Sequence, residues 1–140
     1  MAEKLKMSVG CVWPPEEKRT DTAKGRNLLT GLPQSITVST DDMLEALEEP
    51  AQMILSAIQR VLETTPPELI GDIFTDGIVL TGGGGLIDGL DKLITSKTGV
   101  ACRIPEDAVS CVARGTGMSV KYIDVLSNQD YRMRNRMSKE

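Results

Sequence analysis

Histidine is absent from the 140-residue sequence. This absence excludes Ser-His and Cys-His catalysis and every metal site that uses an imidazole ligand. Aromatic residues make up only 3% of the sequence, so the core must be built from leucine, isoleucine, valine, methionine and alanine. The three cysteines, Cys11, Cys102 and Cys111, are an odd number at unrelated spacings. That pattern favours buried thiols in a reducing compartment over a disulfide framework.

Long hydrophobic runs are absent as well. No run approaches the ~20 apolar residues that cross a bilayer, and the opening stretch, MAEKLKMSVG, lacks the apolar segment of a signal peptide. We therefore expect a cytoplasmic chain. The net charge is −4, whereas nucleic-acid-binding domains usually carry a basic balance, so we expect no nucleic-acid partner. Hydrophobic residues at 40% and charged residues at 26% predict one globular domain of ordinary size.

Short β-leaning segments occupy the first part of the chain. Residues 2–10 resemble the last turns of a helix that runs into a strand over residues 7–13. Residues 16–25 predict an exposed strand, and the weak alternation of residues 34–40 predicts another. These segments together predict a small antiparallel sheet of three strands.

A helical period follows this sheet. Thr40 is the expected N-cap, and Met43 stands where a capping box needs Glu or Gln, so we predict no capping box. Pro50 suits the first turn of a new helix. In that helix the i, i+4 spacing places three apolar side chains on one face, which we expect to be buried against the small sheet. The three residues are Ile54, Ile58 and Leu62.

Carboxylates cluster near the start of this helical region. They could bind a metal, but carboxylates near a helix N-terminus are usually surface charges that the helix dipole favours, so we expect no metal site. Methionines at helical positions, among them Met43, Met53 and Met118, are expected in the core. The acidic cluster comprises Asp41, Asp42, Glu45, Glu48 and Glu49.

The second half of the sequence predicts a βαβα unit with parallel strands. Pro66 and Pro67 end the preceding helix, and residues 67–74 predict a further short one. A buried strand then runs into a glycine-rich turn. The expected helix over 86–99 has Gly99 as its C-cap. A strand over 100–107, a helix over 109–127 and a disordered tail over 128–140 complete the prediction.

The glycine turn, Gly82 to Gly85, follows Thr81 at the end of the buried strand. Glycine costs roughly 0.5–1 kcal/mol of backbone entropy where it is not needed. Two interpretations stay open: a tight connection, or a backbone kept close to a ligand near a helix N-terminus. A P-loop is excluded because no lysine follows the turn until Lys92. A dinucleotide fingerprint is excluded because no register supplies its third glycine.

Three ordered segments carry a family resemblance. GIVLTGGGGLIDGLDKLI resembles the adenosine-proximal glycine turn of the actin-like ATPases, AEKLKMSVG their ribose-contacting helix end, and DAVSCVARGTGMSV their last core helix. With GRNLLTGLPQSITVST and EPAQMILSAI, the chain resembles the bacterial actins of the MreB family over residues 1 to about 127. Family members are more than twice as long, so the chain is expected to correspond to their C-terminal part.

The resemblance implies a fold class, which is an α/β, partial actin-like (ribonuclease H-like) lobe. Residues 1–70 would form most of a small α+β subdomain, and residues 71–127 the end of a βαβα large subdomain. Glu3 and Lys6, three apart on one helix face, would contact the ribose and base. Gly82, Gly83 and Gly84 would bring the backbone against the nucleotide, and Gly85 replaces the family's commoner alanine. ATP would be the cofactor, with Mg in the complete protein.

The resemblance also implies partners and an activity. The family forms ATP-dependent filaments under the cytoplasmic membrane and directs cell-wall synthesis for rod shape. Self-association is expected because the small subdomain lies at the longitudinal subunit contact, and membrane association would come through other segments or proteins. The phosphate loops and the water-positioning acid lie on segments upstream of those matched here, so no catalytic residue is assigned and no hydrolysis by this chain alone is expected. The alternative function is a half-actin interaction module that binds a partner without nucleotide.

Overall fold

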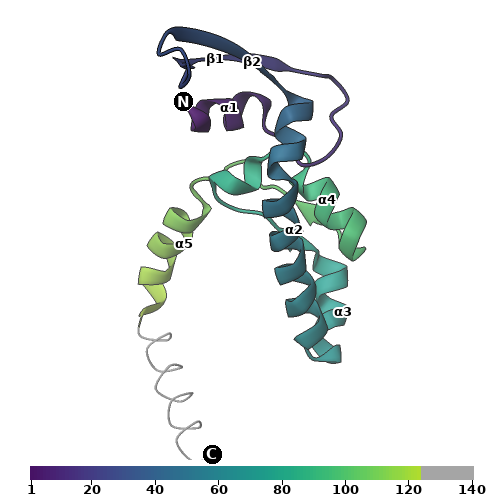
Figure 1. Cartoon of the computed structure of the whole chain (residues 1–140). Coiled ribbons are helices and arrows are strands. Elements are labelled where there is room, and N and C mark those ends of the chain that lie inside the picture. Colours follow the sequence, from purple (N-terminus) through teal and green to yellow (C-terminus); the bar gives the residue numbers. More distant parts are fainter. Residues whose placement is uncertain (124–140) are drawn as a thin grey trace, which may run out of the picture.

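A computed structural model describes residues 1–123, and Figure 1 shows how their elements are arranged. A β-hairpin and a short helix lie at one end, one long helix descends from them, and the remaining helices surround its lower part or project away from it. The elements in chain order are α1 (Ala2–Val9), β1 (Thr20–Arg26), β2 (Pro33–Ser39), α2 (Thr40–Thr64), α3 (Pro67–Asp76), β3 (Ile78–Val79), the 3-10 helix η1 (Gly83–Leu86), α4 (Leu90–Thr98), β4 (Cys102–Arg103), α5 (Cys111–Ser119) and the 3-10 helix η2 (Val120–Tyr122).

The first sheet has two strands instead of the predicted three. Strands β1 and β2 pair antiparallel, with Thr20 opposite Ser39 and Arg26 opposite Pro33. The predicted strand over 7–13 is wrong, because the residues that look β-leaning there continue α1 as far as Val9. Beyond the helix, Cys11 forms only an isolated parallel bridge with Asp88.

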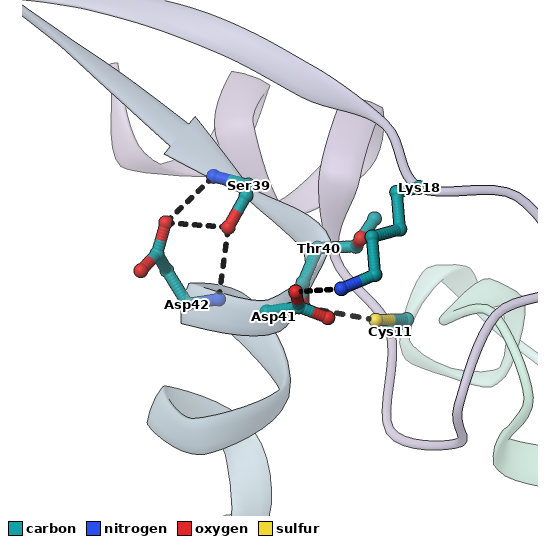
Figure 2. Close-up of polar contacts among 6 residues, drawn as sticks. All are labelled: Cys11, Lys18, Ser39, Thr40, Asp41 and Asp42. Atoms are coloured by element: carbon teal, nitrogen blue, oxygen red, sulfur yellow. Dashed lines mark hydrogen bonds and ion pairs between the residues drawn. The ribbon is translucent and has the colours of Figure 1, made fainter.

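The N-terminus of α2 carries a capping box, which the sequence pattern did not predict. The N-cap is Ser39 instead of Thr40, so the third helical residue is Asp42 and not Met43. The hydroxyl of Ser39 accepts from the Asp42 N–H, and the Asp42 carboxylate accepts from the Ser39 N–H, as Figure 2 shows. The prediction considered only Glu or Gln at this position, whereas an aspartate makes the same reciprocal pair.

Helix α2 is continuous through Pro50, so the predicted new helix at this proline is wrong. Proline removes one backbone donor from a helix interior and usually kinks it. Here Ala46, whose carbonyl loses its partner, and Pro50 are both exposed, so water can satisfy that carbonyl. Packing of buried Ala51 and Leu55 just beyond the proline holds the second half of α2 in place.

The buried face of α2 differs from the predicted one. Leu55 is 2% exposed, whereas Ile54 is 45% exposed, and Ile58 and Leu62 are only half-buried. This face packs on α4 and not on the small sheet, because the core that it joins is centred there. The buried residues of that core are Val12, Ala51, Leu55, Leu90, Leu93 and Ile94.

The predicted parallel pairing in the second half is confirmed: β3 and β4 are parallel, with Ile78 opposite Cys102 and α4 between them in sequence. Gly99 ends α4 with φ +72°, which confirms the predicted left-handed C-cap. Both strands are shorter than expected, at two residues each. The intervening helix begins at Leu90, because the glycine turn forms the separate 3-10 helix η1.

The structure describes the C-terminal part of the chain as far as residue 123. Helix α5 falls within the predicted helix over 109–127, whose end lies outside the described residues, as does the predicted tail over 128–140. Met53 and Met118 are exposed, so their predicted place in the core is wrong. Within residues 1–123, no helix is long and apolar enough to cross a bilayer.

Candidate functional site

A cavity of about 640 Å³ lies between α1 and the glycine turn. We call it the α1–turn cavity. Its volume falls within the range of small-molecule sites, and its wall mixes apolar side chains with a few charged ones, as such sites usually do. Four of the five residues predicted to contact a nucleotide line it, and Gly82 does not. The lining residues are Glu3, Lys6, Met7, Gly10, Arg19, Gly83, Gly84, Leu86, Ile87, Asp88, Gly89, Asp91, Ile104 and Val109.

Helix α1 contributes Glu3 and Lys6 to one wall of this cavity. Their i, i+3 spacing places them on one face, as the sequence predicted, and Lys6 Nζ lies 2.8 Å from Glu3 Oε2. Glu3 stands in the first turn of the helix and Lys6 in the last, so each charge also suits the helix dipole. The ammonium and carboxylate groups are therefore held together at the edge of the cavity, where they can donate to and accept from a ligand.

The glycines of the turn fall into three groups. Gly82 has φ +80°, a left-handed conformation that side chains rarely adopt. Gly85 is buried, and a Cβ there would lie 3.2 Å from Leu80 Cβ, so the turn packs tightly on the preceding strand. Gly83 and Gly84 have no positive φ, and a Cβ at either would meet nothing within 4 Å. Their lack of a side chain leaves the cavity wall open and is not demanded by the packing of the described residues.

Arg19 and Asp88 also line the cavity, and the sequence pattern predicted a site role for neither. Arg19 Nη2 donates to Asp88 Oδ2 across a separation of 69 residues. No local sequence signal predicts an ion pair between residues so far apart in the sequence, because the pair depends on how loop 10–19 meets the end of the glycine turn. Figure 1 shows α1 between the hairpin above it and the η1 region below it.

The charged groups of the cavity largely neutralise one another. Lys6 pairs with Glu3 and Arg19 pairs with Asp88, and the fifth charged side chain is Asp91, in the first turn of α4. Below this wall, burial raises the pKa of the Cys11 thiol, and the nearby Asp88 carboxylate adds to that shift. This thiol is therefore protonated at neutral pH and donates to Thr40 O at 3.3 Å (Figure 2).

Two residues of the acidic cluster at the start of α2 have partners from the protein itself. Asp41 pairs with Lys18, and Asp42 caps the helix through Ser39, as Figure 2 shows. In the part of the chain that the structure describes, no group of three or more Cys, Asp or Glu side chains is arranged to hold a metal ion.

Comparison with solved structures identifies the fold. The crystal structure of MreB5 of Spiroplasma citri bound to ADP matches with a TM-score of 0.83 and 33% identity, over 87% of this chain and 37% of that one. MreB5 of Spiroplasma citri bound to AMPPNP matches with a TM-score of 0.82 and 31% identity, over 92% of this chain and 39% of that one. The predicted fold class, a partial actin-like lobe, is therefore confirmed.

Sequence comparison agrees with the structural one. The chain is 44% identical over 124 residues to the cell shape-determining protein MreB of Escherichia coli K12, and 40% identical over 125 residues to the cell shape-determining protein Mbl of Bacillus subtilis. Each match covers 89% of this chain but only 36% and 38% of those relatives, so the chain spans little more than a third of their length. The family model for MreB/Mbl protein matches residues 1–128. The chain belongs to the MreB/Mbl family of cell shape-determining proteins.

Proposed function

We propose that this chain forms the adenosine side of the nucleotide site in an MreB-type filament protein. Glu3 and Lys6 would contact the ribose and base from α1, and Gly83 and Gly84 would bring the backbone of the turn against the opposite side of the nucleotide. Gly82 would act indirectly, because its left-handed conformation turns the chain into η1. The complete protein would use ATP to assemble filaments that direct cell-wall synthesis and rod shape.

The observation that carries this proposal is the open space at Gly83 and Gly84. Each glycine loses more backbone entropy on folding than another residue would. Since neither is needed for a positive φ or for packing among residues 1–123, we attribute both to a ligand that approaches the backbone. The cavity that they line has the size of a small-molecule site and faces Glu3 and Lys6. The two MreB5 structures, which hold ADP and AMPPNP, support a nucleotide as that ligand.

Magnesium fits this portion of the protein less well than the nucleotide does. A Mg²⁺ ion bound with nucleotide usually takes one or two carboxylates together with phosphate oxygens and water. Of the three carboxylates in the cavity, those of Glu3 and Asp88 are each paired with a cation, which leaves Asp91 alone, and residues 1–123 hold no cluster of metal ligands. We therefore assign no metal ligand here and derive no step through the ion.

Self-association is the second part of the proposal, and an exposed hairpin tip favours it. Leu28 is 99% and Leu29 96% exposed in the connection between β1 and β2, where Asn27 Oδ1 accepts from the N–H groups of Leu29 and Thr30. Apolar side chains held at the tip of a structured turn are typical of surfaces that bind a partner. Lys24 and Arg26 lie on the hairpin together with Asp21, whereas Lys18 and Arg19 in the segment before it are paired with Asp41 and Asp88.

An apolar groove that could receive the leucine tip lies at the opposite end of the molecule. It has a volume of about 400 Å³, it lies where α2 meets α3, and its lining is apolar. Acidic side chains lie on the same elements: Glu63, Glu68, Asp72 and Asp76. The leucine-tipped hairpin β1–β2 and the helix α3, which borders the apolar groove, lie at opposite ends of the molecule (Figure 1). This placement fits a head-to-tail contact, which extends into a filament when it does not close into a ring. The groove is lined by Ala57, Ile58, Val61, Leu62, Ile73, Gly77 and Ile78.

The division of the chain belongs to the same proposal. Residues 1–70 would correspond to the small subdomain and residues 71–127 to the end of the large one. The alternative function, an interaction module that binds a partner without nucleotide, is favoured by the same exposed leucines. Association that proceeds equally with and without ADP, in a chain that does not bind ADP, would favour that alternative.

Calorimetric titration of the chain with ADP tests the nucleotide site. Because this portion holds only the adenosine side, we expect weak binding, no better than about millimolar or about −4 kcal/mol. Gly83→Trp places a ring in the open wall and should abolish it. Gly71→Trp is the matched control, because Gly71 is exposed on α3 and a Cβ there would meet nothing within 4 Å. Equal ADP binding by the two variants would contradict the proposed site.

A further inference from the structure

Arg19 and Asp88 connect segments that are far apart in the sequence, and each has its backbone fixed by a different neighbour. The Arg19 carbonyl accepts a hydrogen bond from the N–H of Thr40, at the start of α2, at 3.0 Å. The Asp88 carbonyl accepts from the N–H of Val12 at 3.0 Å. The side chains of the two residues then meet, so the pair joins loop 10–19 and the start of α2 to the end of the glycine turn.

The same pair forms the wall between two hollows. Both residues line the α1–turn cavity, and both also line a neighbouring pocket of about 330 Å³ that contains Trp13. Next to the pair, Gly89 has φ +79°, and a Cβ there would lie 2.3 Å from Trp13 Cβ. Asp88 therefore precedes a glycine that is pressed against the Trp13 segment, which fixes the backbone from which its carboxylate extends.

Arg19 and Asp88 line the α1–turn cavity together with the residues of its two sides. Glu3 and Lys6 stand on one side of the cavity and Gly83 and Gly84 on the other. A half-exposed ion pair contributes little to global stability. It can nevertheless hold one side of a cavity at a fixed distance from the other, because its two ends are anchored to separate backbone hydrogen bonds.

We propose that Arg19 and Asp88 are a positioning pair, which holds the glycine turn against loop 10–19 and so sets the cavity width that an adenosine-containing nucleotide requires. Neither charge touches the nucleotide; they act through the turn. The inference rests on the proposed nucleotide site and adds to it the residues that fix its geometry.

A charge-swap cycle tests the pair with two measurements on the full chain. The variants are Arg19→Ala, Asp88→Ala and the double variant Arg19→Asp/Asp88→Arg. The first measurement is the affinity for ADP, and the second is the amide hydrogen-exchange rate of residues 83–88 in the absence of ligand. The matched control is Lys18→Ala, because Lys18 is adjacent and forms a similar surface pair with Asp41 but lines neither hollow.

We expect each single variant to weaken ADP binding about threefold to tenfold and to speed exchange in the turn, with both effects largely reversed in the double variant. Lys18→Ala should change neither quantity. If Arg19→Ala weakens binding while Asp88→Ala does not, and the swap restores nothing, then Arg19 contacts the ligand directly and the inference is overturned. Unchanged exchange in the turn also overturns it.

The two measurements separate this inference from the proposed function. If the wild-type chain binds no ADP, the proposed nucleotide site is contradicted. The hydrogen-exchange rates of residues 83–88 then decide whether the pair holds the glycine turn in place. Faster exchange in the single variants, reversed in the double variant, would support the positioning pair. Faster exchange with unaltered ADP affinity would overturn the claim that the pair sets the width of the nucleotide cavity.

Discussion

Ser39 and Asp42 close the N-terminus of α2 through two reciprocal hydrogen bonds. The Asp42 N–H donates to Ser39 Oγ at 3.2 Å, and the Ser39 N–H donates to Asp42 Oδ2 at 2.8 Å (Figure 2). Two backbone donors that the helix cannot satisfy internally are thereby paired. Since α2 supplies Ala51 and Leu55 to the core beneath the cavity, this cap supports the element on which the candidate site rests.

Removal of the cap hydroxyl should lower stability. Ser39→Ala leaves the Asp42 N–H without its acceptor, and loss of such a cap typically costs about 1 kcal/mol. The measurement is the free energy of unfolding by urea. The control is Ser35→Ala, at an exposed position of β2 that caps no helix. An unchanged free energy of unfolding in Ser39→Ala would show that the cap does not form in solution.

The same pair predicts a dependence on pH. The Ser39 hydroxyl, and after it the Ser39 N–H, hold the pKa of the Asp42 carboxyl below its ordinary value. A carboxyl whose pKa is lowered in the folded state contributes to the free energy of unfolding. This contribution is fully present above the pKa of the unfolded state, about 3.9, and is lost as the pH falls through the pKa of the folded state. The stability difference between wild type and Ser39→Ala should therefore shrink in that acid range. A difference that stays constant down to complete protonation would contradict this interpretation.

The core beneath the cavity predicts a contrast between neighbouring residues. Leu55→Ala removes a side chain that is 2% exposed and should cost about 2–5 kcal/mol. Ile54→Ala, one position earlier and 45% exposed, should change stability by less than about 1 kcal/mol. Thermal unfolding of both variants checks the contrast. A larger loss of stability in Ile54→Ala than in Leu55→Ala would support the buried face that the sequence spacing predicted.

Local signals predicted the parts of the fold that depend on local chemistry. The left-handed glycine at position 99 and the strand–helix–strand order predicted the end of α4 and the parallel pairing of β3 with β4, and both are confirmed. The errors arose where tertiary packing prevails over local preference. Pro50 suggested a break, but packing around Leu55 keeps α2 continuous. Residues 7–9 looked β-leaning but continue α1.

The site divides in the same way. The spacing of Glu3 and Lys6 and the glycine turn were visible in the sequence, and Glu3, Lys6, Gly83 and Gly84 line one cavity, whereas Gly82 and Gly85 do not. Arg19 and Asp88 were not found, because 69 residues separate them and their meeting depends on the whole fold. The different reasons for the four glycines were likewise hidden, since they depend on backbone angles and on distances to Leu80.

Catalysis by the chain alone should be absent. Phosphoryl transfer needs groups that surround the transferring phosphate and orient the attacking water. The basic groups of the described cavity are Lys6 and Arg19, and each is already paired with a carboxylate. We therefore expect no phosphate release from ATP by the purified chain. Turnover that persists through purification and disappears in Gly83→Trp would contradict this expectation.

The hairpin tip should drive association. Leu28→Ser/Leu29→Ser removes the exposed apolar tip and should reduce the weight-average mass measured by sedimentation equilibrium at high protein concentration. Val112→Ser is the control, because Val112 is exposed on α5, away from the hairpin. Ile73→Asp, in the groove, should act like the tip variant if the groove receives the tip. A wild-type chain that sediments as a single monomeric species would argue against this contact.

The most direct test of the nucleotide site is a chemical-shift map of the backbone amides during titration with ADP, which detects millimolar binding residue by residue. The account predicts saturable shifts at Glu3, Lys6, Gly83 and Gly84, with the amides of Gly25 and Gly71, both outside the cavity, unmoved. Saturable shifts confined to residues away from the α1–turn cavity, or none at any ADP concentration, would contradict it.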